Sequence, residues 1–272
     1  MRKEIRFQLI NAFNSTGFLR VCILSLFFGV LCFVICCIMD FKADILSVQA
    51  AYMQFFPNRI PEVRMIFGIM MPLLACCAYS DSYLSDLNNN YFPVCATRMN
   101  AKKYYFSKLI AVFFCGAFVL FLPQIVNCLL CLITFPLEST NLYTNELMQS
   151  ELYTFELENV MFKGLYIISP YLYYLLYIFI SSAFSGLIAV IGYQLSFFVK
   201  NKIFVMSFAF IFINMFSVFC EFYSVRLDVL KCLFGLEVPC PSYLQFALIA
   251  AIYIFAAAAP IPFALRKVRD NV

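Results

Sequence analysis

Long stretches of apolar and uncharged residues alternate along the chain with short segments that carry the charged residues. A helix needs roughly 20 residues, at about 1.5 Å per residue, to cross about 30 Å of hydrocarbon. The pattern therefore predicts an all-α fold, a polytopic membrane helix bundle with six transmembrane helices in one domain, residues 1–272. The predicted spans cover about residues 21–39, 65–80, 109–137, 170–199, 203–220 and 242–265.

The number of spans depends on the fourth of these regions. No charged residue occurs between Gly164 and Val199, a stretch too long for one helix and slightly short for two spans with a turn. The Ser169-Pro170 pair near its start favours an interfacial segment followed by one long helix, because the residue before a proline is biased away from helical geometry. Six spans is the prediction, and five or seven are the alternatives.

The distribution of lysine and arginine predicts that both termini are cytoplasmic. With six spans, the cytoplasmic segments are 1–20, 81–108, 200–202 and 266–272, and they hold 13 of the 19 basic residues against four acids. A seventh span would move the basic residues of the last segment to the other side and weaken this bias.

Composition supports the same class of protein. Hydrophobic residues make up 64% of the chain and charged residues only 12%, where a soluble domain has about 25% charged residues. This excludes a cytosolic enzyme, a secreted domain and a nucleic-acid-binding module. The chain has no histidine, which excludes imidazole metal sites and histidine-dependent catalysis.

Residues 1–19 are predicted to form an amphipathic helix ahead of the first span. Ile5, Leu9 and Phe13 fall close to one helical face, and Arg2 and Arg6 lie elsewhere. Such a segment is typical of a helix that lies in the membrane interface. The alternative is a positively charged anchor that only fixes topology. A cleaved signal peptide is disfavoured, because the apolar run begins late and is long.

Most of the 13 cysteines lie within or beside the predicted spans, where they act as small apolar residues. Cys232 and Cys240 fall in the last external loop, and a disulfide between them is sterically possible if the compartment is oxidising. Ser181, Ser185 and Ala189 recur at four-residue spacing in the fourth span, which allows close approach of another helix. That helix belongs either to the same bundle or to a second chain.

Two absences narrow the possible functions. The chain has no G-x-x-x-x-G-K-[ST] motif, so it cannot hydrolyse ATP by the P-loop route on its own. It also has no charged residue in the middle of a span, which argues against proton-coupled transport. A membrane-embedded enzyme that uses Cys or Ser chemistry is disfavoured, because no histidine can activate the nucleophile.

The segment from Asp81 to Leu109 is unlike a plain connecting loop. It reads DSYLSDLNNNYFPVCATRMNAKKYYFSKL, with an acidic residue, a polar stretch with a short apolar centre, a basic residue and Tyr-x-x-x-Lys before the third span. This resembles the signature region of type-two ABC exporter (ABC-2 type) permeases, which are six-span subunits of bacterial transporters. The residues that carry the resemblance, and that it assigns to coupling with an ATPase, are Asp86, Leu87, Tyr91, Phe92, Arg98, Tyr104 and Lys108.

The resemblance implies how such a chain works. Residues 1–19 would be an elbow helix, and a short cytoplasmic coupling helix would carry Leu84, Leu87, Tyr91 and Phe92 into a groove of a separate ATP-binding cassette protein. The chain would hold no cofactor and catalyse nothing itself, since the partner binds the ATP. A second permease chain, identical or different, would face the first in the lipid of a bacterial cell membrane. The cargo would be hydrophobic or amphipathic: a peptide, a lipid-like molecule or a drug.

A different class of function also fits the sequence. The chain could be a regulatory or structural membrane protein that binds a cytoplasmic partner through residues 81–108 without transporting anything. Neither reading involves nucleic acid.

Overall fold

The computed structural model describes most of the chain, and the residues it describes are 85% helical with no strand. The described ranges are 2–41, 48–56, 60–92, 95, 100–137, 161–223 and 242–270. Within them, six helices are long and apolar enough to span a membrane. The predicted all-α fold with six such helices is confirmed, and it supports a multi-pass membrane protein.

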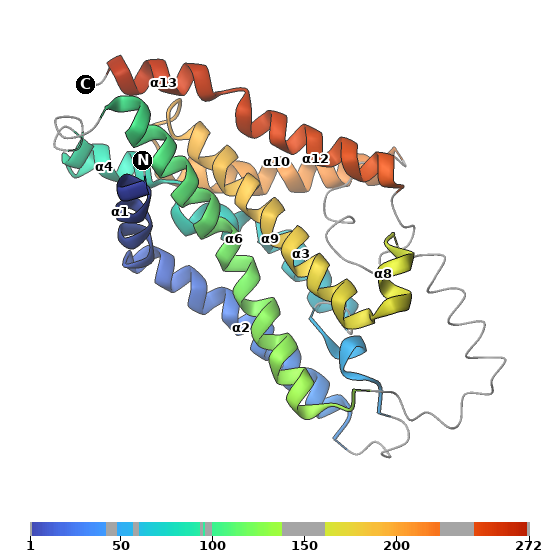
Figure 1. The fold of residues 1–272 in the computed structure, drawn as a ribbon. Coiled ribbons are helices and arrows are strands. Elements are labelled where there is room, and N and C mark those ends of the chain that lie inside the picture. Colours follow the sequence, from blue (N-terminus) through green and yellow to red (C-terminus); the bar gives the residue numbers. More distant parts are fainter. Residues whose placement is uncertain are drawn as a thin grey trace.

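The elements follow one another along the chain in a simple order (Figure 1). They are α1 (Arg2–Phe13), α2 (Thr16–Met39), the 3-10 helix η2 (Ala51–Gln54), α3 (Pro61–Tyr79), α4 (Ser82–Asn88), α6 (Ala101–Thr134), α8 (Lys163–Ile168), α9 (Pro170–Leu195), α10 (Lys202–Phe222), α12 (Tyr243–Ala258) and α13 (Ile261–Asp270).

Several helices begin earlier than predicted, because local capping decides where a helix starts. α2 begins at Thr16, five residues before the predicted span, where the Ser15 hydroxyl accepts a hydrogen bond from the Phe18 N–H at 3.3 Å. α6 begins at Ala101 rather than at residue 109, where the Asn100 side chain caps the helix. The predicted helix over 1–19 is likewise two helices, separated at Ser15.

The fourth region contributes a single span. Ser169 has extended geometry, with φ −163° and ψ 116°, and separates the short α8 from the long α9. α9 then continues without interruption to Leu195, four residues short of the predicted end. The sixth span is interrupted at Pro260, beyond which α13 continues.

α6 and α9 lie side by side through the middle of the bundle, with α2 against α6 on one side and α12 against α9 on the other (Figure 1). The serine and alanine positions of α9 form this contact. Ser185 donates a hydrogen bond to the Gly116 carbonyl of α6 at 2.7 Å, and the Ala189 methyl group fills the space that a side chain at Gly116 would need. The predicted small residues of α9 therefore pack against a helix of the same bundle, which was one of the two alternatives, and not against a second chain.

A buried amide joins three segments at the other end of α6. The side chain of Asn127 donates to the Gly29 carbonyl of α2 at 2.9 Å and accepts from the Phe56 N–H at 2.7 Å. Both contacts are buried, so neither partner can be satisfied by water instead.

Asn127→Leu is expected to lower the free energy of unfolding by about 1–3 kcal/mol, because it leaves the buried Phe56 N–H without its acceptor. The measurement is thermal unfolding of the purified protein in detergent. Thr134→Val is the matched control on the same helix, since the Thr134 hydroxyl is exposed and bonds only within its own helix. Equal melting of the two variants would contradict a structural role for the amide.

Candidate functional site

The segment that carries the family resemblance forms a short helix, α4, directly after α3. The end of α3 is fixed by Ser80, whose buried hydroxyl donates to the Ala189 carbonyl of α9 at 2.8 Å. α4 follows α3 after Ser80 and Asp81. The position of α4 therefore depends on α3 and on the contact of Ser80 with α9.

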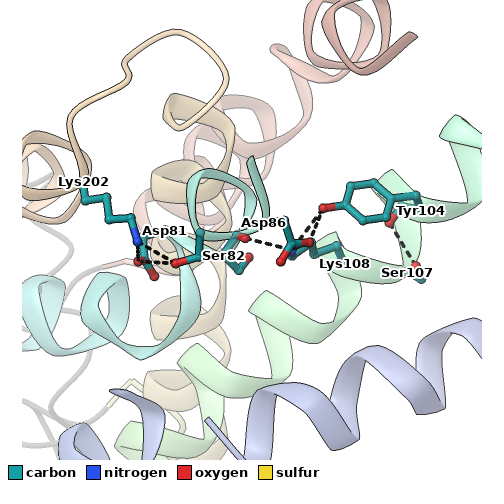
Figure 2. A network of polar contacts seen from close by, with 8 residues as sticks. Asp81, Ser82, Asp86, Tyr104, Ser107, Lys108 and Lys202 are labelled. Atoms are coloured by element: carbon teal, nitrogen blue, oxygen red, sulfur yellow. Dashed lines mark hydrogen bonds and ion pairs between the residues drawn. The ribbon is translucent and has the colours of Figure 1, made fainter. Parts of the chain in front are cut away.

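A buried ion pair ties α4 to α6 (Figure 2). The Lys108 side chain of α6 is fully buried, and its ammonium donates to the Asp86 carboxylate of α4. The same ammonium donates to the Ser82 carbonyl at 2.9 Å and to the Tyr104 hydroxyl at 3.1 Å. The Tyr104 hydroxyl in turn donates to Asp86 at 2.5 Å. We call Asp86, Tyr104 and Lys108 the buried cluster.

This arrangement accounts for all three donors of the lysine ammonium. Taking two charges out of water is costly, and the cost is offset only where the geometry is good and additional hydrogen bonds are made. The Lys108 ammonium also lies 5.2 Å from the centre of the Tyr104 ring, a distance at which a cation is attracted to the ring face. The buried cluster therefore fixes α4 rigidly on α6.

A second ion pair ties α4 to α10 (Figure 2). The Lys202 ammonium lies 3.6 Å from the Asp81 carboxylate and donates to the Ser85 hydroxyl at 2.7 Å. Ser85 donates onward to Asp81 at 3.2 Å. The lysine side chain is 38% exposed, so this pair is worth about 0–1 kcal/mol.

Aromatic rings fill the space beneath α4. The Tyr83 ring lies 4.1 Å from that of Phe197 and 5.8 Å from that of Phe92, which lies 5.3 Å from Tyr104. Phe92 is 2% exposed and Leu84 3%. Both side chains are already buried within the chain, Phe92 between Tyr83 and Tyr104, so neither is exposed for the predicted contact with a groove of a partner.

Four consecutive residues at the end of α4 are exposed, and we call them the loop tip: Asn88, Asn89, Asn90 and Tyr91. Asn90 has a φ of 52°, a left-handed conformation that asparagine tolerates better than most residues. Tyr91 is 37% exposed. Desolvation by its partial burial raises the pKa of Tyr91, and a hydrogen bond with the Asn11 side chain of α1 opposes the rise.

The structure thus brings together four of the seven residues singled out from the sequence: Asp86, Tyr104 and Lys108 through hydrogen bonds, and Phe92 through its ring contact with Tyr104. Leu87 is half-buried on α4 and Tyr91 is at the surface. Arg98 lies outside the described residues.

The predicted disulfide partners, Cys232 and Cys240, also lie outside the described residues. Among the residues that are described, no group of three His, Cys, Asp or Glu side chains is arranged to hold a metal ion.

Sequence reasoning missed Lys202 and Phe197, which come from other segments, and it gave no role to Ser85 of α4, which binds Lys202. A signal for part of the site was present, however. Lys108 stands alone at the edge of a long apolar run, and a cation in such a place needs an acidic partner.

Comparison with known proteins gives no relative: no family model, curated protein or solved structure matches this chain. The resemblance to type-two ABC exporter permeases therefore stays a prediction from the sequence.

Proposed function

We propose that the chain is the transmembrane permease subunit of a bacterial ABC transporter that exports a hydrophobic or amphipathic cargo. ATP would be bound and hydrolysed by a separate ATP-binding cassette protein, and the permease would need no cofactor of its own. A second permease chain would complete the path in the cell membrane, with both termini of this chain in the cytoplasm.

The observation that carries this proposal is the rigid attachment of α4. A membrane subunit without its own ATPase needs a cytoplasmic surface that passes a movement of the partner to the spans. α4 is continuous with α3, joined to α6 through the buried Asp86–Lys108 pair and joined to α10 through Lys202. A displacement of α4 would therefore reach α3 and α6 as a rigid-body movement, and the exposed Lys202 pair would add a weaker link to α10.

The loop tip, rather than the apolar face of α4, would contact the ATPase under this proposal. Asn88, Asn89 and Asn90 are exposed amides next to the exposed Tyr91 ring. Tyrosine is enriched at protein interfaces because it combines a large ring with a polar end. α1 would act as the elbow helix beside this contact.

Tyr91→Glu is expected to reduce the amount of ATP-binding cassette protein that copurifies with the tagged chain from native membranes at least tenfold, since it places a charge at the centre of the contact. The partner is identified by mass spectrometry through its Walker motif. Tyr223→Glu is the matched control, an exposed tyrosine at the far end of α10, and should leave copurification unchanged.

Two results would contradict the proposal. A chain that purifies without any ATPase in mild detergent favours the regulatory or structural alternative. Equal copurification by Tyr91→Glu and the unchanged protein would remove the loop tip from the contact.

A further inference from the structure

The first helix leaves its large apolar side chains largely outside the bundle. Gln8 and Ala12 of α1 are buried against the bundle, where α1 contacts α6, and Asn11 is half-buried beside them. Phe7 and Ile10 face outward and are 41% and 49% exposed. A surface helix normally turns its apolar stripe toward the protein core. Here apolar side chains face away from the protein, which is typical of a helix that lies in the membrane interface.

A shallow, open groove of about 380 Å³ runs along this face. Residues of α1 and the adjacent Asn14 alone line it: Arg2, Ile5, Arg6, Leu9, Ile10, Phe13 and Asn14. Both arginines lie toward the start of α1, and both are exposed. The prediction that they lie away from the face of Ile5, Leu9 and Phe13 is wrong, because all five side chains line the same groove. Within the part of the chain that the structure describes, neither makes an ion pair with an acid. The groove is therefore cationic at one end and apolar along the rest of its length.

We propose that this groove binds one anionic phospholipid taken from the bilayer. Arginine guanidinium groups match phosphate oxygens with paired hydrogen bonds, so Arg2 and Arg6 hold the headgroup phosphate. The glycerol and the upper part of an acyl chain lie against Ile5, Leu9 and Ile10. The site rests on the geometry of α1 and is independent of the proposed transport function.

A lipid bound at α1 would also affect the loop tip, because α1 lies next to it. Asn11 is half-buried on the opposite side of α1 from the groove, and its side chain lies beside Tyr91 and acts to lower the pKa of that residue. A lipid that holds α1 in the interface therefore also holds the residue that supports the loop tip.

The chain contains no tryptophan, which permits a site-specific test. Phe7→Trp places one indole on α1 beside the groove without lining it. The variant is reconstituted in phosphatidylcholine vesicles of two kinds. One kind contains brominated phosphatidylglycerol and the other contains brominated phosphatidylcholine. The brominated acyl chains quench the indole on contact. Quenching should show that phosphatidylglycerol is preferred, by about fivefold for each arginine that contacts the phosphate.

The ratio of quenching by phosphatidylglycerol to quenching by phosphatidylcholine should fall to about one when Arg2→Gln and Arg6→Gln are added. The preference should persist in the matched control Arg266→Gln with Lys267→Gln, which removes two exposed cations from α13. Phe255→Trp, on the exposed face of α12, should show equal quenching by the two lipids. Unfolding curves of all variants establish that each is folded.

Equal quenching of Phe7→Trp by the two lipids would overturn the proposal. So would a preference that survives the loss of both arginines, or one that is lost equally in the α13 control, which would indicate only the general attraction of a basic surface. Displacement of the quencher by millimolar inorganic phosphate would make the groove a site for free anions instead of lipid.

Discussion

Asp86→Asn is expected to lower the free energy of unfolding by about 3–5 kcal/mol, because it leaves the Lys108 ammonium buried without a counter-ion. Lys108→Met should cost less, since the group it leaves alone is the Asp86 carboxylate, which is 17% exposed where Lys108 is fully buried. The melting temperature in detergent, followed with a thiol-reactive dye, should fall on the order of 10 °C for Asp86→Asn. The dye suits this chain because most of its described cysteines are buried free thiols.

The double variant Asp86→Asn with Lys108→Met removes both charges and should regain most of the loss, because an ion pair replaced as a whole leaves no isolated charge. Lys202→Met is the matched control, since it breaks the exposed pair with Asp81 and should cost no more than about 1 kcal/mol. If Asp86→Asn and Lys202→Met melt alike, or if the double variant regains nothing, α4 is not held by the buried pair.

The six long helices were predictable from the sequence because each is bounded by charged residues and carries almost none inside. The ends of these helices were not predictable in the same way. A method that takes charged residues as the boundaries of a span necessarily places every charged residue outside a helix. Lys108 shows the error: it lies inside α6, stabilised by its partner on α4, and α6 begins seven residues earlier. At the start of α2 the correct boundary could be seen in Ser15-Thr16, a serine directly before a helical run.

The buried cluster was predictable only as a set of residues and not as a geometry. Asp86 and Lys108 are 22 residues apart, and nothing in their spacing shows that they meet. Phe92 shows the converse limit. Its place in an apolar pattern indicates that it will be buried, but burial in a partner and burial under Tyr83 and Tyr104 give the same pattern. Tertiary contacts decide between them.

Gly116→Leu is expected to have the second large effect on stability, because the contact between α6 and α9 has no room for a side chain at this position. A β-carbon there would overlap that of Ala189 and lie 3.2 Å from the Ser185 carbonyl oxygen. The two helices would have to separate, and the Ser185 hydroxyl would lose its bond to the Gly116 carbonyl. Overpacking of this kind costs about 1–3 kcal/mol for added methylenes, and loss of the buried hydrogen bond adds about 1 kcal/mol.

Gly17→Leu is the matched control, since a β-carbon at Gly17 of α2 meets no atom within 4 Å. It should stabilise the protein slightly, because leucine favours helix by up to about 1 kcal/mol over glycine. A smaller change tests the mechanism itself: Gly116→Ala should destabilise, and Ala189→Gly added to it should restore much of the loss by removing the opposing methyl group. Rescue by Ala189→Gly would place the cost in the α6–α9 contact, whereas equal melting of Gly116→Ala with and without it would place the cost elsewhere in the bundle. Because α6 and α9 are packed this closely, they are expected to move together. Under the proposed function, a displacement of α4 would therefore reach both helices.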